Sequence, residues 1–180
     1  KTYFRNVRIK TENLDPKPFD SDIFVVNNRK NELTDYEITQ GWRLLFNGQN
    51  AEGWVGAYKD SFPDFGWSVS DGVLTIAASD GGESTNAGDI VTEEKFSAFD
   101  LGFEFKLTEG ANSGVKYFVT LSENNSGSAI GLEYQILDDE KHPDAKMGRD
   151  GNRTLASLYD LIKADKQSRF VKPIGEWNKG

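Results

Sequence analysis

Apolar and polar residues alternate along most of this chain with a period of two, which is the pattern of β-strands that bury one face. The alternation is clearest over Asp100–Leu107, Val115–Leu121 and Ile130–Leu137, and polar or glycine-bearing segments separate these runs. Several short strands at this spacing are typical of a sandwich or jelly roll. We therefore expect an all-β fold built from antiparallel sheets.

The strongest local signal lies between Trp67 and Ile76, where two apolar-alternating runs flank Asp71-Gly72. Asp-Gly is a favoured two-residue hairpin turn, and such a turn pairs Val69 with Leu74 and Trp67 with Ile76. The large apolar side chains then share one face of the hairpin. Because turn chemistry and alternation agree independently, we predict a hairpin here.

The ends of the chain differ from its body. Thr2 to Lys10 reads as a strand in which Tyr3, Val7 and Ile9 share one face, and residues 11–33 read as a linker that holds Pro16 and Pro18. Thr34 followed by Glu37 forms the capping-box pattern of a helix start. We expect the main domain to span 34–180, with residues 154–162 open between a short helix and a strand.

The alternation also predicts which side chains are mostly buried. These are Trp67, Val69, Leu74, Ile76, Phe103, Phe105, Tyr117, Leu132 and Tyr134.

Charge and composition narrow the choice of partner. The formal net charge of −8 disfavours binding to nucleic acid phosphates, whereas neutral sugars remain suitable ligands. The absence of cysteine excludes thiolate metal sites and thiol nucleophiles. No apolar run reaches the roughly 18 residues of a transmembrane helix, and no signal peptide is visible at Lys1.

Polar side chains gather on the strand Ile130–Leu137. Its apolar positions fall on one face, and Glu133 and Gln135 lie on the other, with Asp138 just beyond the strand and His142 in the loop that follows. Such a face is either solvated or lines a cleft. A carboxylate tuned by its surroundings is suited to general acid or base catalysis, and a loop histidine can transfer protons, bind a metal or simply be exposed.

Trp54 follows Gly53 in an expected loop, where its flat ring could stack on a sugar or pack in the core. Asn112-Ser113-Gly114 reads as a turn. No cofactor motif is present. Arg149-Asp150-Gly151-Asn152 matches only a fragment of a calcium loop, so we expect no cofactor, with a divalent cation as the open alternative.

Taken in order, several motifs resemble the 3-keto-disaccharide hydrolase family. The matching stretches are Gly41-Trp42-Arg43-Leu44-Leu45-Phe46-Asn47-Gly48, Gly53-Trp54, Trp67-Ser68-Val69-Ser70-Asp71-Gly72-Val73-Leu74, Gly88-Asp89-Ile90-Val91-Thr92, Phe99-Asp100-Leu101 through Glu104-Phe105-Lys106, Gly110-Ala111-Asn112-Ser113-Gly114-Val115, Gly131-Leu132-Glu133-Tyr134-Gln135-Ile136-Leu137-Asp138, Leu158-Tyr159-Asp160 and Gly175-Glu176-Trp177-Asn178. Their shared order covers residues 41–180.

The resemblance implies a concanavalin A-like jelly roll, a hydrolase acting on glycosides oxidised at C3, and a periplasmic, secreted or cell-surface setting. By position it marks a polar cleft, within which we assign Glu133 as the base that removes the C2 proton and His142 or Asp138 as the acid for the leaving aglycone. The expected substrate-binding residues are Asn112, Gln135, Lys116, Trp54 and Tyr159. An ordinary two-carboxylate glycosidase and a non-catalytic carbohydrate-binding module are the alternatives.

One feature departs from the family pattern. Members end on a strand that reads much like Tyr3 to Lys10, whereas here this strand comes first. We expect residues 1–10 to close a preceding sandwich of the same kind, with 34–180 lacking its last strands. In the alternative arrangement the chain is permuted, and residues 1–10 complete the 34–180 sandwich itself.

Overall fold

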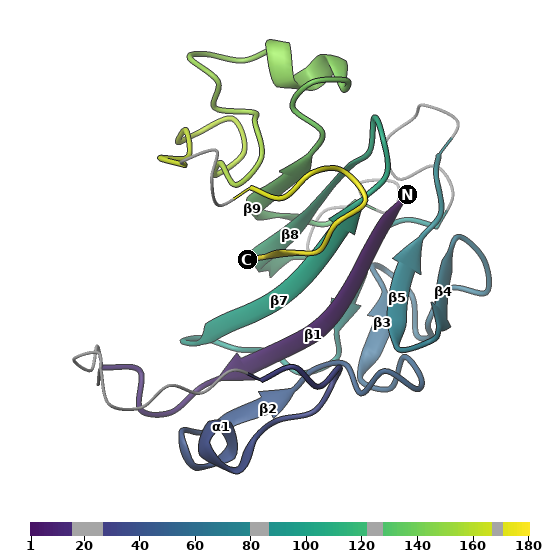
Figure 1. Cartoon of the computed structure of the whole chain (residues 1–180). Coiled ribbons are helices and arrows are strands. Elements are labelled where there is room, and N and C mark those ends of the chain that lie inside the picture. The colour runs from purple at the N-terminus through teal and green to yellow at the C-terminus, as the bar shows by residue number, and fades with distance from the viewer. Residues whose placement is uncertain (16–26, 80–86, 122–127, 167–170) are drawn as a thin grey trace.

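The computed structural model describes residues 1–15, 27–79, 87–121, 128–166 and 171–180. Its largest element is an antiparallel sheet of six strands, in the order β10-β7-β1-β5-β4, with β2 also paired to β1. Two smaller antiparallel pairs, β3-β6 and β8-β9, complete the β-structure (Figure 1). The bounds of the strands are β1 Thr2–Lys10, β2 Trp42–Leu44, β3 Trp54–Gly56, β4 Trp67–Ser70, β5 Val73–Ile76, β6 Ile90–Thr92, β7 Asp100–Leu107, β8 Asn112–Thr120, β9 Ile130–Leu137 and β10 Asn178–Lys179.

The helical content is one short α-helix, α1 (Asp35–Thr39), and one 3₁₀ turn, η1 (Pro143–Lys146), among the described residues. Helix α1 begins as expected, because the Thr34 hydroxyl accepts a hydrogen bond from the Glu37 amide and the Glu37 carboxylate accepts one from the Thr34 amide. The all-β prediction is confirmed. The described residues include no helix with the length and apolarity that a membrane span requires.

The β4-β5 hairpin has the predicted register, with Val69 opposite Leu74 and Trp67 opposite Ile76. Asp71 and Gly72 both have positive φ, 53° and 76°, as a type I′ turn requires. Leu74 is buried and Trp67 and Val69 pack partly buried against the same core. Local turn chemistry therefore sets this part of the sheet.

Strand β1 lies inside the six-stranded sheet, which corrects the expected domain arrangement. It pairs with β7 over most of its length, with β5 through Thr2–Phe4 and with β2 through Arg8–Lys10. We expected residues 1–10 to close a preceding sandwich. That expectation is wrong, because both edges of β1 pair with strands of the sheet formed by residues 42–179. Of the expected linker, residues 16–26 lie outside the described residues.

The inward face of β1 also differs from simple alternation. The register with β7 shifts between Arg5 and Arg8, and Asn6 has a φ of 51°. This bulge adds one residue, so Phe4, Val7 and Ile9 are buried, whereas Tyr3 faces outward beside Lys106. Asn31 stabilises the bulge through two hydrogen bonds. Its side-chain Oδ1 accepts from the backbone amide of Asn6, and its backbone amide donates to Oδ1 of Asn6.

The core lies between the six-stranded sheet and the two smaller strand pairs. Phe103 of β7 meets Tyr134 of β9 edge-to-face, with ring centroids 5.5 Å apart, and Val115 of β8 packs against the same cluster. Leu74, Phe103 and Phe105 are buried as expected. Trp67, Val69, Ile76, Tyr117 and Tyr134 are partly buried.

The expected burial of Leu132 is wrong, since its side chain is 37% exposed. Strand β9 is covered unevenly along its length. Segment 156–159 forms backbone hydrogen bonds to Glu133 and Gln135 and so lies beside that part of β9. These hydrogen bonds begin one residue after Leu132. The same segment resolves the open prediction for 154–162, which forms turns and isolated bridges rather than a helix or a regular strand.

Candidate functional site

A cavity of about 1300 Å³ runs along strand β8 and extends to β1, β5 and β6. Apolar side chains of the main sheet, such as Phe4 and Leu74, form part of its wall, and polar side chains of β8, β9 and the 142–159 loops form another part. The lining includes seven of the eight expected site residues. They are Trp54, Asn112, Lys116, Glu133, Gln135, His142 and Tyr159.

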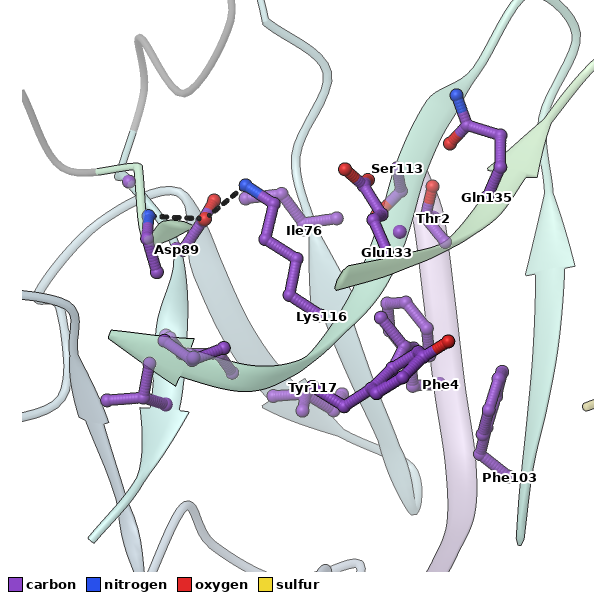
Figure 2. Close-up of a pocket in the computed structure, with 18 of the residues that line it drawn as sticks. Thr2, Phe4, Ile76, Asp89, Phe103, Ser113, Lys116, Tyr117, Glu133 and Gln135 are labelled. Carbon is purple, nitrogen blue, oxygen red and sulfur yellow. Dashed lines mark hydrogen bonds and ion pairs between the residues drawn. The ribbon is translucent and has the colours of Figure 1, made fainter. Parts of the chain in front are cut away.

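The strand register explains why the polar residues meet. Strand β8 pairs with β9 so that Lys116 lies opposite Glu133 and Gly114 opposite Gln135. Directly paired residues share a face of an antiparallel sheet, so these four positions present one polar surface. Figure 2 shows Lys116, Glu133 and Gln135 on this surface. Asn112 belongs to the same strand, which corrects its expected place in a turn, because β8 begins at residue 112.

The Glu133 carboxylate lies over the Cα atom of Gly114. A Cβ atom built at Gly114 would overlap Oε1 of Glu133 and would stand 2.6 Å from both Cδ and Cγ. Glu133 is half-buried, and its backbone oxygen accepts a hydrogen bond from the Tyr159 amide at 2.9 Å. The missing side chain at position 114 therefore provides the space in which this carboxylate lies.

The Lys116 ammonium is bound at the other end of this surface. Its Nζ donates to Oδ2 of Asp89 at 2.8 Å (Figure 2). It also donates to the Ser128 hydroxyl at 3.0 Å. The same Asp89 oxygen accepts from the Ala129 amide. Asp89 thus fixes the lysine and the start of the segment that leads into β9.

Gln135 is a deeply buried polar residue of the lining, with 1% of its surface exposed. Its Oε1 accepts a hydrogen bond from the Ile136 amide at 3.0 Å, which fixes the orientation of the amide group. Within the part of the chain that the structure describes, no acceptor takes a hydrogen bond from Nε2. This nitrogen is consequently a fixed donor available to a ligand in the cavity.

His142 caps the short turn η1. Its Nδ1 accepts a hydrogen bond from the Asp144 amide at 3.2 Å, so in neutral His142 the proton is on Nε2. Its backbone amide donates to Asp138 and fixes the loop to the end of β9. Nε2 is therefore the histidine nitrogen available to a ligand.

Tyr159 is held by a charged network on the cavity wall. Its hydroxyl donates to Asp144 Oδ2 at 2.9 Å, and Arg153 binds Asp144 and Asp160. Burial, together with the hydrogen bond to Asp144, raises the pKa of Tyr159 to about 12. The phenol is therefore neutral near pH 7 and cannot serve as a base there.

Asp138 does not line the cavity, and this separates it from the other expected site residues. Its carboxylate accepts hydrogen bonds from the backbone amides of Gly110, Glu140 and Lys141, at 2.8, 3.0 and 3.2 Å. Burial alone would raise the pKa of Asp138, but these three hydrogen bonds and the Lys141 charge outweigh it and lower the pKa. A carboxyl group held in its ionised form is poorly suited to donate a proton to a leaving group.

This geometry predicts a structural role for Asp138. We expect D138A to lower the free energy of unfolding by about 2 kcal/mol, because three partly buried backbone amide hydrogen bonds lose their acceptor, and to change kcat by less than about threefold. Since the pKa of Asp138 is lowered on folding, its stabilisation is present above its ordinary pKa of 3.8 and is lost as the pH falls through the folded value. Urea denaturation of both proteins at neutral and acidic pH measures this; a kcat loss of a hundredfold in folded D138A would contradict the assignment.

Trp54 lies at the first position of β3 and not in a loop. Its Nε1 donates to the Leu45 oxygen at 2.6 Å, and its ring packs against the hydrophobic core. The ring also lines the cavity, but it is partly buried and fixed in the wall. This arrangement favours the core-packing interpretation over an exposed sugar platform.

Sequence reasoning assigned no role to two residues of this site, Asp89 and Gly114. A glycine inside an alternating strand commonly marks a close approach of another group, which was an available signal for Gly114. Asp89 pairs with a lysine 27 residues away, so no local pattern indicates the contact. The described residues hold no group of three or more His, Asp and Glu side chains arranged for a metal ion.

Comparison with known proteins identifies the family. A family profile described as a 3-keto-alpha-glucoside-1,2-lyase-like domain matches residues 41–180. The chain belongs to this family. A 3-keto-disaccharide hydrolase from Bacteroides thetaiotaomicron is 40% identical over 150 residues, which cover 77% of this chain and 51% of that protein. This chain therefore matches about half the length of that curated relative.

A solved structure also resembles this member of the 3-keto-alpha-glucoside-1,2-lyase-like family. It is a crystal structure from Parabacteroides distasonis of a protein provisionally assigned as a glycosyl hydrolase, with a TM-score of 0.67 and 30% sequence identity. The similarity covers 83% of this chain and 67% of that protein. The match agrees with the antiparallel, concanavalin-like sandwich described above.

Proposed function

We propose that this site cleaves the glycosidic bond of sugars that carry a ketone at C3. The observation that carries the proposal is the polar surface of β8 and β9, where the Glu133 carboxylate lies in the space above Gly114. Gln135 lies two residues along the same strand and has a fixed donor. A base and a donor on one rigid face are what removal of a proton next to a carbonyl requires.

The C3 ketone determines the chemistry. It acidifies the hydrogen on C2, so that a carboxylate can remove this proton while the electrons move onto the C3 oxygen as an enolate. The enolate then collapses, a C1–C2 double bond forms, and the C1–oxygen bond to the aglycone breaks. Addition of water to this product gives net hydrolysis, and release of the unsaturated product gives a lyase reaction.

The described residues supply groups for each step. Glu133 takes the C2 proton, and Gln135 Nε2 donates to the oxygen on which the enolate charge develops. Asn112 is a second amide on the same lining. His142 Nε2 is the donor for the departing aglycone oxygen, because Asp138 lies outside the cavity with its carboxylate bound by backbone amides.

Two alternatives use the same cavity. A two-carboxylate glycosidase needs one carboxyl group that is protonated, but each of the other lining carboxylates is paired with a cation. Asp89 pairs with Lys116, Glu94 with Arg43 and Asp144 with Arg153. A carbohydrate-binding module needs no base at all. The experiment below separates all three functions.

The protein should release the aglycone from a 3-keto-glucoside and leave the parent glucoside intact, because only the ketone acidifies the C2 hydrogen. The assay follows aglycone release from matched 3-keto- and unoxidised p-nitrophenyl glucosides, with solvent deuterium entering C2 as the mark of proton abstraction. Cleavage of the unoxidised glucoside at a similar rate would favour the two-carboxylate glycosidase. Saturable binding of either sugar without turnover would favour the binding module.

A further inference from the structure

The glycine at position 114 has a role beyond permitting strand formation. It is the third residue of β8, a nine-residue strand, and the structure describes no turn there that needs its conformational freedom. Its φ is not among the positive values of the chain. The backbone at this position would accept any residue, so the reason for glycine lies in what occupies the space above it.

That space is filled by the side chain of Glu133. A Cβ at position 114 would overlap Oε1 and would stand 2.6 Å from Cδ and Cγ, closer than real Cβ contacts occur. The conflict reaches Cγ, so rotation of the carboxylate group alone does not relieve it. Because χ1 sets the position of Cγ, Glu133 would have to change its χ1 rotamer and leave its present place on the polar surface.

We propose that Gly114 is a positioning residue that sets where the Glu133 carboxylate lies, and therefore where the base meets the C2 hydrogen. The inference rests on the proposed function for its catalytic consequence, but not for its geometric one. General-base catalysis depends on hydrogen-bond reach to the proton removed, and a displacement of about 1 Å costs on the order of a hundredfold in rate. Gly114 acts through Glu133, because it has no side chain of its own that could take part in the reaction.

The chain offers a matched control in Gly102 of β7. It too is a strand glycine without positive φ, and a Cβ there would meet a neighbouring side chain, with Arg8 Nε at 3.1 Å and Cγ at 3.4 Å. Gly102 does not line the cavity. G102A therefore makes the same chemical change in the same kind of element, away from Glu133.

The test is a double-mutant cycle measured with a 3-keto-glucoside. We expect G114A to lower kcat about a hundredfold with a smaller change in KM, G102A to change it less than about threefold, and G114A in the E133Q background to add less than about threefold. A glycine needed only for folding would reduce activity by the same factor in both backgrounds. Wild-type kcat in G114A, or an equal loss with E133Q, would overturn the proposal.

Crystal structures of the wild type and G114A give a readout that is independent of activity. We expect the Glu133 carboxylate to leave the position above residue 114 in the variant, while β8 and β9 keep their register. An unmoved carboxylate would overturn the inference. If the wild type shows no turnover, the proposed function fails, and these two structures still decide whether residue 114 positions Glu133.

Discussion

E133Q should lower kcat on a 3-keto-glucoside by about 10²- to 10⁴-fold, which is the usual contribution of general acid–base catalysis. Glutamine keeps the shape of the side chain and fills the same space above Gly114, but it cannot accept the C2 proton. Substrate binding should persist, because the change removes a proton acceptor and leaves the volume of the site unaltered. The expected result is therefore a large loss in kcat with a small change in KM.

E140Q is the matched control for this variant. Glu140 is exposed, lies seven residues further along the chain and does not line the cavity, so its kcat should stay within about twofold of the wild type. Solvent deuterium exchange at C2 adds a second measurement, since it should disappear in E133Q together with aglycone release. Unchanged turnover in folded E133Q would remove Glu133 from the role of base.

Q135M should lower kcat by about 10²- to 10³-fold, which is the effect of removing one hydrogen-bond donor from an oxyanion site. Methionine has a similar length and lacks the Nε2 donor that faces the cavity. It also removes the acceptor of the Ile136 amide, so we expect a stability loss of about 1 kcal/mol, too small to unfold the protein. KM should change little, because the enolate charge develops only as the reaction proceeds.

Q49M provides the comparison, as Gln49 is an exposed side chain away from the cavity. Its kcat should match that of the wild type. If Q135M instead raises KM while kcat is retained, then Gln135 binds the ground state of the substrate and does not stabilise the enolate. Thermal denaturation of both variants ensures that the comparison is made between folded proteins.

The sequence predicted those features that depend on a few neighbouring residues. The Asp71-Gly72 hairpin, the Thr34 capping box and the alternating burial of β7 follow from turn chemistry and a period of two, and each was found. The same alternation placed Glu133 and Gln135 on one face, because that relation is internal to a single strand. The loop that follows this strand indicated His142, and a family motif added Tyr159; both residues line the same cavity.

The tertiary structure decided what depends on partners distant in sequence. Asn31, 25 residues from Asn6, holds the bulge that moves Val7 and Ile9 into the core with Phe4, and both edges of β1 are paired by strands later in the chain. Asp138 appeared in sequence to belong with Glu133, but the Gly110 amide, 28 residues earlier, helps to bind its carboxylate outside the cavity. The sequence by itself thus determined the strands and their polar face, whereas packing between distant segments determined which of those polar groups reach the cavity, because hydrogen-bond partners far apart in the chain leave no local pattern.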